Sequence, residues 1–439
     1  MLENEELKGF LKSATALHSL GKVHSYKNFV LVCVGSKENP QIRFSVYKAM
    51  DEVYNRYSGS DNILALDGKY SGDALYALVM KSYSYQFLKK KTELIKKLKL
   101  YCPENNEICL KILKIANAQN FARFLGDTPA NLMTPVTMSE YIKDYFLNEP
   151  IDLKIFDKSF LEKEKMNLVL AVSQGSAEEP RFIHAKYFGR DSTQIDLAMV
   201  GKGVTFDTGG ISIKPSREMF KLKQDMMGAA ILTCVLKLVS QLRLKVNVSL
   251  TLPLVENMPG ASAVKPGDVV KSLSGKTVEI DNTDAEGRLI LADAITFAQR
   301  DNPKYLIDVA TLTGAVRIAL GNVHGAYFTD DEAFSDLIYQ SGKEANDIIW
   351  RLPLSPFFEE NLKSPVADIC NIDRSLSGAG ASVAANFIKS FVNKSVIWAH
   401  FDVSGIRNNH FLKTIFGDQT TARPLASLFT LVENLHIHD

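Results

Sequence analysis

From about residue 136 onward, short apolar runs alternate with stretches of helical spacing, and this alternation constrains the fold most strongly. It is typical of an α/β domain with a mainly parallel central sheet flanked by helices. Ligands of such sheets bind at the carboxyl ends of the strands. We expect strands at residues 153–156, 168–172, 182–187, 197–200, 246–254, 306–309, 326–329 and 396–401, and helices at 228–242, 289–300, 332–342 and 382–392.

The first part of the chain predicts a smaller unit. Strands near 29–34 and 63–66 and helices over 42–57 and 74–100 indicate an N-terminal α/β domain at residues 1–104. A long helical pattern then ends at a Gly-Asp-Thr-Pro stop signal. We therefore expect a connecting helix over 105–126 and the larger domain over 127–439.

The charge balance excludes a strong general attraction to nucleic acid or acidic membranes, because 51 Lys and Arg face 50 Asp and Glu. No apolar run reaches the roughly 18 residues of a membrane span. The acidic start, Met1–Glu6, lacks the pattern of a signal peptide. Five scattered cysteines predict reduced thiols. Together these features predict a cytoplasmic protein without membrane or nucleic-acid partners.

One octapeptide, residues 282–289, places Asp284 and Glu286 two residues apart, followed by Gly287 and Arg288. Gly287 would let the chain turn. An apolar helical pattern begins directly afterwards. Crowding two carboxylates at a helix entrance costs free energy unless a cation binds there, and a divalent metal is the usual partner. Taken alone, the stretch also fits an acidic helix cap without a ligand.

A glycine-rich loop over 201–214 follows a buried strand and carries Lys202, Asp207 and Lys214. Its spacing matches neither common phosphate-binding motif, which disfavours a nucleotide site. Glycines there would instead let the backbone pass close to an ion. Asp225 begins the next apolar helix, as a simple N-cap or as a ligand.

Four acids (Asp207, Asp225, Asp284 and Glu286) thus follow strands or begin helices, and four carboxylates would balance two divalent ions. The chain has no HExxH motif and no histidine cluster of metal-binding spacing. Any metal site must therefore be rich in oxygen ligands, helped at most by a lysine amine.

These segments, with residues 308–314, resemble the leucine aminopeptidases, also called cytosol aminopeptidases. The octapeptide NTDAEGRL is intact, and such a match is highly specific. The resemblance covers about 125–439, including 398–402 and Arg423-Pro424, whereas residues 1–124 match only in kind. It implies a catalytic two-metal peptidase domain over 127–439 and a homohexamer whose active sites face an enclosed cavity.

The resemblance also implies a ligand set. One zinc ion would be held by Asp207, Asp284 and Glu286, assisted by the main-chain carbonyl of Asp284. The other would be held by Lys202, Asp207, Asp225 and Glu286, and one site is expected to exchange zinc for manganese or magnesium. Lys202 can ligate a metal only as a neutral amine, so its pKa would have to fall.

The implied reaction is hydrolysis of the first peptide bond of a peptide or amino-acid amide with a free amino group. A water or hydroxide bridging the metals would attack. Lys214 would act as the electrophile, and Arg288 would hold a bicarbonate ion as general base. Substrate contacts are implied at Leu222, Asn282, Thr311, Leu312 (through its backbone), Gly314 and Thr420.

The implied preference is a leucine-like or broadly apolar first residue, but three departures bear on it. Leu222 stands where methionine is common, Met227 where glycine is common, and Thr420-Thr421-Ala422 replaces a stretch that is often glycine-rich with an apolar residue. The threonines predict a more polar side-chain pocket.

Two alternatives remain at this point. One is a non-catalytic or DNA-binding scaffold, against which the intact Lys214 and Arg288 and the balanced charge argue. The other is a nucleotide-dependent enzyme that uses the glycine-rich loop.

Overall fold

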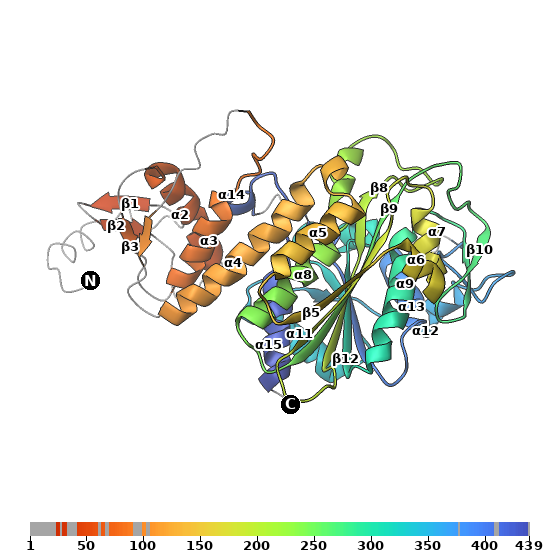
Figure 1. Cartoon of the computed structure of the whole chain (residues 1–439). Helices are drawn as coiled ribbons and strands as arrows, with labels where there is room; N and C mark the ends of the chain where they lie inside the picture. Colours follow the sequence, from red (N-terminus) through yellow and green to blue (C-terminus); the bar gives the residue numbers. More distant parts are fainter. Residues whose placement is uncertain are drawn as a thin grey trace. The chain divides into compact units, whose positions relative to one another are not determined.

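The structure is a computed structural model in which the chain forms two compact units. One unit consists of the chain up to Asn120 and a short C-terminal segment that ends at Asp418. The other unit consists of the rest of the chain. The structure describes residues 23–26, 29–32, 42–59, 63–65, 70–90, 99–101, 106–375, 378–407 and 412–437 (Figure 1).

A mainly parallel sheet forms the centre of the larger unit. Among the described residues it has nine strands, in the order β14-β13-β16-β12-β7-β9-β6-β5, with β8 also paired to β9. This arrangement confirms the predicted α/β class. The strands are β5 (Ile151–Phe156), β6 (Arg181–Phe188), β7 (Leu197–Gly201), β8 (Gly203–Asp207), β9 (Asn247–Asn257), β12 (Tyr305–Ala310), β13 (Ala326–Phe328), β14 (Trp350–Arg351) and β16 (Ile397–Asp402).

Parallel pairing joins β16, β12, β7 and β9 in the middle of the sheet, and β5, β6 and β13 pair antiparallel nearer the edges. Every residue of β7 is buried, as expected for a strand covered on both faces. The carboxyl ends of β7 and β12 therefore open at one edge of the sheet, which is where a ligand can enter.

Helices cover both faces of this sheet (Figure 1). Helices α8 (Met227–Gln241), α11 (Glu332–Glu344) and α15 (Leu425–Ile437) pack together on one face. Helices α7 (Asn167–Ser173), α9 (Glu286–Ala298) and α13 (Gly380–Lys389) form the other layer and share one apolar core with the sheet. The remaining helices are α5 (Pro135–Phe146), α6 (Lys158–Glu164), α10 (Gly314–Leu320) and α12 (Pro356–Glu360).

A small three-stranded sheet lies beside the main one. It consists of β10 (Asp268–Lys271), β11 (Thr277–Ile280) and β15 (Ile369–Cys370). The octapeptide follows β11 and leads directly into α9. The chain that leaves β15 runs beside the octapeptide, since Asn371 is hydrogen-bonded to it as described below.

The N-terminal unit packs α2 (Ile42–Tyr57) against α3 (Ser71–Ser82) and the first part of α4 (Asn106–Asp127). Its strands pair as β1 (Val23–Tyr26) with β2 (Phe29–Val32) and β3 (Ile63–Ala65) with β4 (Lys99–Tyr101). The short helix α14 (Lys413–Phe416) contributes Ile415 and Phe416 to the same core. The two units divide inside α4, after Asn120.

Three sequence-based expectations were wrong. Residues 168–172 lie in helix α7 rather than in a strand, because a five-residue apolar run carries no distinguishing period. The predicted helix over 74–100 ends at Ser82, where Tyr83 is extended, and residues 99–101 form a strand. Part of the predicted loop over 201–214 is strand β8, paired in parallel with β9.

Of the cysteines, Cys109, Cys234 and Cys370 are buried free thiols, and Cys33 and Cys102 lie outside the described residues. Within the described part of the chain, none of the helices combines the length and the apolar character that a membrane crossing requires.

Candidate metal centre and active site

The centre is built around Lys202, which lies between the end of β7 and the start of β8. The flanking glycines are needed for space: a Cβ at Gly201 would be 2.8 Å from the Cα of Ala229, and one at Gly203 would be 2.5 Å from the carbonyl oxygen of Pro253. Tight packing on both sides thus fixes Lys202 at the carboxyl edge of the sheet, with a side chain that is 3% exposed.

The Lys202 ammonium holds together three segments that are distant in sequence. Its Nζ atom lies 2.7 Å from Oδ2 of Asp225 and 2.8 Å from Oε1 of Glu286. It also donates a hydrogen bond of 2.9 Å to the carbonyl oxygen of Thr311. The segment before α8, the octapeptide and the segment after β12 therefore meet at one nitrogen atom beyond the end of β7.

Lys214 makes a second cationic contact in the same cluster. Its Nζ atom lies 2.6 Å from Oδ2 of Asp207 and is in close contact with Oδ1 of Asp284. Asp207, Asp284 and Glu286 each offer a carboxylate oxygen, and these oxygens lie within 4.8 Å of one another. The structure thus brings together six of the seven predicted metal-binding and catalytic residues. The seventh, Arg288, is described below.

Electrostatics in the cluster are strongly coupled. Burial and the neighbouring Asp207 raise the pKa of Glu286 to about 7, against the opposing effect of Lys202. Burial lowers the pKa of Lys202, but the carboxylates of Asp225, Glu286 and Asp207 outweigh burial, and the net pKa is raised. The neighbouring carboxylates therefore favour the ammonium form of Lys202 here. The expected fall in its pKa concerns the metal-bound protein and stays a prediction.

Three hydrogen-bond donors orient the buried aspartates. Oδ1 of Asp207 accepts hydrogen bonds from Nδ2 of Asn257, at 2.8 Å, and from the backbone N–H of Gly209, at 2.9 Å. Oδ1 of Asp225 accepts one of 2.7 Å from the Thr311 hydroxyl. In both residues the other oxygen, Oδ2, is left facing a lysine. Such outer contacts fix the direction of a metal ligand.

Asp225 does not cap α8, which settles one alternative left open by the sequence. It ends the short 3₁₀ helix η3 (Met219–Gln224), and the residue that precedes α8 is Met226. Its side chain points instead to Thr311 and Lys202.

Asn371, which follows β15, folds the octapeptide into place. Its Oδ1 accepts hydrogen bonds from the backbone N–H groups of Asp281, at 2.9 Å, and Asn282, at 3.3 Å. Its Nδ2 donates to the carbonyl of Asn282 at 2.7 Å. The Asn282 side chain forms a hydrogen bond within the octapeptide, because its Oδ1 accepts from the N–H of Asp284 at 2.8 Å.

Arg288 is the third residue of α9, and its side chain is almost fully buried. Its Nη1 donates a hydrogen bond of 2.6 Å to the carbonyl of Asn371, whereas its buried Nε has no partner among the described residues. Burial lowers the pKa of Arg288 to about 10, with Glu286 and Asp402 acting in the opposite direction. A buried N–H without an acceptor is a place where an anion can bind.

The predicted substrate-contact residues lie on several elements. Leu222 is in η3 and Gly314 is the first residue of α10, where a Cβ would meet no other atom within 4 Å. Leu312 has its N–H engaged with Oδ1 of Asp402 at 3.1 Å. Any backbone contact from Leu312 to a ligand must therefore use its carbonyl oxygen.

Thr420 is fully buried, and its hydroxyl donates to the carbonyl of Arg407 at 3.1 Å. The hydroxyl of Thr421 donates to the carbonyl of Ile406 at 2.6 Å. The Thr420 methyl group and the Met227 sulfur both face the space beside Gly126. Both threonine hydroxyls therefore donate to backbone carbonyls, and the more polar side-chain pocket stays a prediction.

Asn257, Asn371 and Asp402 were missed by sequence reasoning. Each lies at or just beyond the end of a strand, which was the available signal. The hydrogen bonds that link them to the segments of the site span between 26 and 90 residues of the sequence, so no local pattern relates them to the acids.

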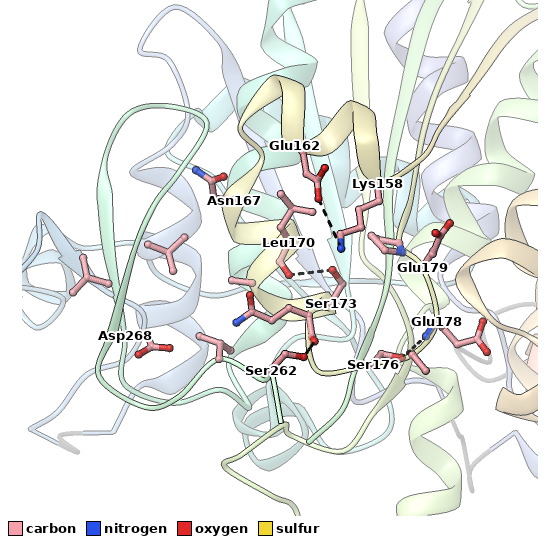
Figure 2. Close-up of a pocket in the computed structure, with 17 residues that line it drawn as sticks. Lys158, Glu162, Asn167, Leu170, Ser173, Ser176, Glu178, Glu179, Ser262 and Asp268 are labelled. Atoms are coloured by element: carbon pink, nitrogen blue, oxygen red, sulfur yellow. Dashed lines mark hydrogen bonds and ion pairs between the residues drawn. The ribbon is translucent and has the colours of Figure 1, made fainter. Parts of the chain in front are cut away.

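A separate cavity of about 670 Å³ lies beside α7 and β10 and contains none of the predicted site residues (Figure 2). Its charged lining residues largely pair with neighbours. Lys158 lies 3.8 Å from Glu162, Glu179 lies 3.0 Å from Arg181, and Asp268 lies 2.8 Å from Lys265. The cavity therefore offers no comparable concentration of unneutralised charge.

Comparison with known proteins gives a consistent result. Residues 120–429 match the model of the cytosol aminopeptidase family, catalytic domain. The chain is 44% identical over 412 residues to the cytosol aminopeptidase of Encephalitozoon cuniculi, covering 92% of this chain and 84% of that protein. It is 43% identical over 292 residues to the probable cytosol aminopeptidase of Bdellovibrio bacteriovorus, covering 66% of this chain and 58% of that protein.

Solved structures agree with the sequence comparison. The bottromycin maturation enzyme BotP superposes with a TM-score of 0.87 at 29% identity, covering 98% of this chain and 96% of that one. A structure of the same enzyme in complex with Mn gives a TM-score of 0.86. The chain therefore belongs to the cytosol aminopeptidase family, a family of metal-dependent peptidases, and carries its catalytic domain over residues 120–429.

Proposed function

We propose that the protein is a two-metal aminopeptidase that removes the first residue from peptides and amino-acid amides. The observation that carries this proposal is the meeting of four carboxylates with two lysine ammoniums at the carboxyl edge of the sheet. Family membership supports a metallo-aminopeptidase in general. The two-metal mechanism, the bicarbonate and the substrate preference are our proposals.

The donor set fits divalent cations. Asp207, Asp284 and Glu286 offer oxygens close enough to share one ion, and burial together with the neighbouring Asp207 raises the pKa of Glu286. We assign a second ion to Lys202, Asp207, Asp225 and Glu286. Carboxylate oxygens suit manganese and magnesium, and zinc also accepts them together with a nitrogen ligand. We propose that the centre binds zinc and that one position exchanges zinc for manganese or magnesium. When bound, such ions activate a water molecule and polarise the scissile carbonyl.

Lys202 must release a proton to serve as a ligand, because only the neutral amine has a free electron pair. In the metal-free protein its ammonium already neutralises Asp225 and Glu286. A divalent ion would take over that neutralisation and remove the cause of the raised pKa. Metal loading should therefore release protons.

Lys214 is suited to stabilise negative charge on the substrate. Its side chain is 21% exposed, whereas the Lys202 side chain is 3% exposed. Once Asp207 and Asp284 are otherwise neutralised, this ammonium can turn towards the carbonyl oxygen of a bound peptide. A positive charge in a largely buried site is most effective where negative charge develops in the transition state.

Arg288 is suited to hold a small planar anion, because its Nε is buried without an acceptor among the described residues. We propose that this anion is bicarbonate and that it accepts the proton of the attacking water. No described histidine contacts the acids of the cluster, and each of the four carboxylates is assigned to metal. A bound bicarbonate would therefore supply the general base that these side chains do not provide.

We further propose that the first side chain of the substrate lies against Leu222, Thr311, Gly314 and Thr420, with Asn282 nearby and the Leu312 carbonyl accepting a substrate N–H. The Thr420 hydroxyl is engaged elsewhere, so its methyl group is left to face Met227 and Gly126. An apolar, leucine-like or broad preference follows. By family membership we also propose a cytoplasmic homohexamer.

The test uses purified protein freed of metal and then reloaded with Zn²⁺ or Mn²⁺. Amides of several amino acids are compared with the same compounds acetylated on the amino group. We expect hydrolysis of leucine amide and of other apolar amides, and none of the acetylated compounds. Metal-loaded, folded protein that hydrolyses no substrate with a free amino group would overturn the proposal.

The DNA-binding scaffold is not favoured, because the balanced charge and the intact Lys214 and Arg288 give it no support. Light scattering combined with size-exclusion chromatography tests the assembly independently of activity, and a monomeric elution would contradict the hexamer.

A further inference from the structure

Asp402, the last residue of β16, is completely buried and accepts four hydrogen bonds. Oδ1 accepts from the N–H groups of Leu312 and Ser404, each at 3.1 Å. Oδ2 accepts from the N–H of Thr313, at 2.9 Å, and from the Thr313 hydroxyl, at 2.7 Å. Among the described residues no lysine, arginine or histidine forms an ion pair with it. Arg288 interacts with it electrostatically, but burying a carboxylate still costs free energy, so its presence needs a reason.

The position of Asp402 in the sheet explains what it does locally. Strands β12 and β16 pair in parallel up to Ala310 and Asp402, which are the last partners in the register. Beyond them the chain leaves the sheet, so the N–H groups of Leu312 and Thr313 have no strand to pair with. The Asp402 carboxylate supplies the acceptors that a further strand residue would otherwise supply.

The segment held in this way contacts two predicted metal ligands. The Thr311 carbonyl accepts the hydrogen bond from Lys202, at 2.9 Å, and the Thr311 hydroxyl donates to Asp225, at 2.7 Å. Thr311 directly precedes the two residues that Asp402 binds. A shift of this segment would therefore disturb both hydrogen bonds at once: the one that Lys202 donates to the Thr311 carbonyl and the one that Asp225 accepts from the Thr311 hydroxyl.

We propose that Asp402 is a positioning residue for the metal centre, and that it acts through Thr311 on Lys202 and Asp225. This inference rests on the proposed function, since it assigns to those two residues the binding of one metal ion. It adds that the affinity of that ion depends on a carboxylate that touches neither the metal nor the substrate.

The principal variant is Asp402→Asn, which keeps the size of the side chain. Both oxygens of Asp402 accept hydrogen bonds from N–H groups. The single oxygen of an asparagine amide can accept from only one of these two sets of donors, and its NH₂ group would face the other set. The matched control is Trp398→Phe on the same strand. The Trp398 indole donates to Asp308 on β12 at 2.8 Å, and the substitution removes this buried link without touching residues 311–313.

The readout is Mn²⁺ binding to metal-free protein, measured by titration calorimetry, with thermal unfolding and leucine-amide kinetics in parallel. For Asp402→Asn we expect one of the two Mn²⁺ sites to weaken by roughly 10–100-fold, with kcat falling at subsaturating metal. Trp398→Phe should lower the melting temperature but keep both Mn²⁺ affinities. Equal Mn²⁺ affinities in Asp402→Asn and the wild type, or an equal loss in both variants, would overturn the inference.

A second variant covers the case in which Asp402→Asn does not fold. Thr313→Val removes the hydroxyl donor to Asp402 and also the acceptor of the Val316 N–H at the start of α10. We expect a smaller weakening of the same site, of roughly five-fold. Unchanged affinity in this variant counts against the inference. The proposed function fails separately, and takes the inference with it, if wild-type protein binds no Mn²⁺ and hydrolyses no leucine amide.

Discussion

Gly287 lies directly against the end of the Lys202 side chain, and a Cβ at this position would be 2.8 Å from Nζ. The sequence suggested that this glycine serves to turn the chain. Its backbone is instead part of helix α9, and it is not among the glycines with a positive φ. Gly287 is therefore needed because a side chain there would occupy the space of the Lys202 side chain, and not because the backbone must turn.

Gly287→Ala should displace Lys202 and weaken one metal site, although alanine is the better helix former by about 1 kcal/mol. We expect activity at limiting metal to fall at least ten-fold. Gly380→Ala is the matched control, because Gly380 also begins a helix and its added Cβ would lie 3.5 Å from the Cβ of Ala315, an ordinary contact. Equal activity and metal content in the two variants would show that Lys202 does not need the space.

Lys214→Ala should lower kcat by roughly 10²–10³-fold while both metal ions stay bound, because Lys214 is proposed to act on the transition state. Its partial exposure and its contacts with Asp207 and Asp284 place it at the edge of the cluster. Steady-state kinetics and metal analysis of the same sample provide the test. Loss of a metal equivalent would instead make Lys214 part of the binding site.

The acids of the proposed metal centre could be picked out from the sequence because crowded acids at strand ends are a local signal, as at Asp284 and Glu286. The groups that orient them could not. Asn371 is 89 residues from Asn282, and Asp402 is 90 residues from Leu312, so only the folded sheet brings these pairs together. Helix α7 was misassigned for a related reason, since it is held by Asp293, whose carboxylate accepts the N–H of Leu168 from a distant helix at 2.8 Å.

Asp225→Ala should lose one metal equivalent, because Asp225 contacts Lys202 and is assigned to one ion only. Asp284→Ala, on the other side of the cluster, should empty the other position. Elemental analysis after dialysis counts the ions, and thermal unfolding in EDTA checks that the variants fold. Two ions per chain in Asp225→Ala would refute the ligand assignment.

Arg288→Ala should abolish any stimulation by bicarbonate, because the proposed anion contact is the unpaired Nε of this residue. Wild-type protein in carbonate-free buffer is expected to gain activity as bicarbonate is added, and the variant to stay at a low constant rate. Arg288→Lys keeps the charge but not the planar group and should behave like alanine. A normal bicarbonate response in either variant would exclude this site for the anion.

Asp293 gives a prediction about stability that does not involve the metal centre. It is completely buried, and burial raises its pKa to about 7, although the N–H groups of Leu273, Leu168 and Val169 act in the opposite direction. An unfolded aspartate has a pKa of about 3.9. Between these values the folded protein binds more protons than the unfolded chain, so this contribution to stability is present at low pH and is lost as the pH rises from about 4 to about 7.

The measurement compares unfolding of wild-type protein and Asp293→Asn in EDTA between pH 4.5 and 8, so that metal release does not contribute. All other titrating groups are shared, and the difference in stability between the two proteins isolates Asp293. We expect this difference to favour the wild type most at the acidic end and to shrink as the pH rises, levelling off above about pH 7. A difference that stays constant, or that grows with pH, would mean that the three N–H donors outweigh burial and keep Asp293 ionised in the folded state.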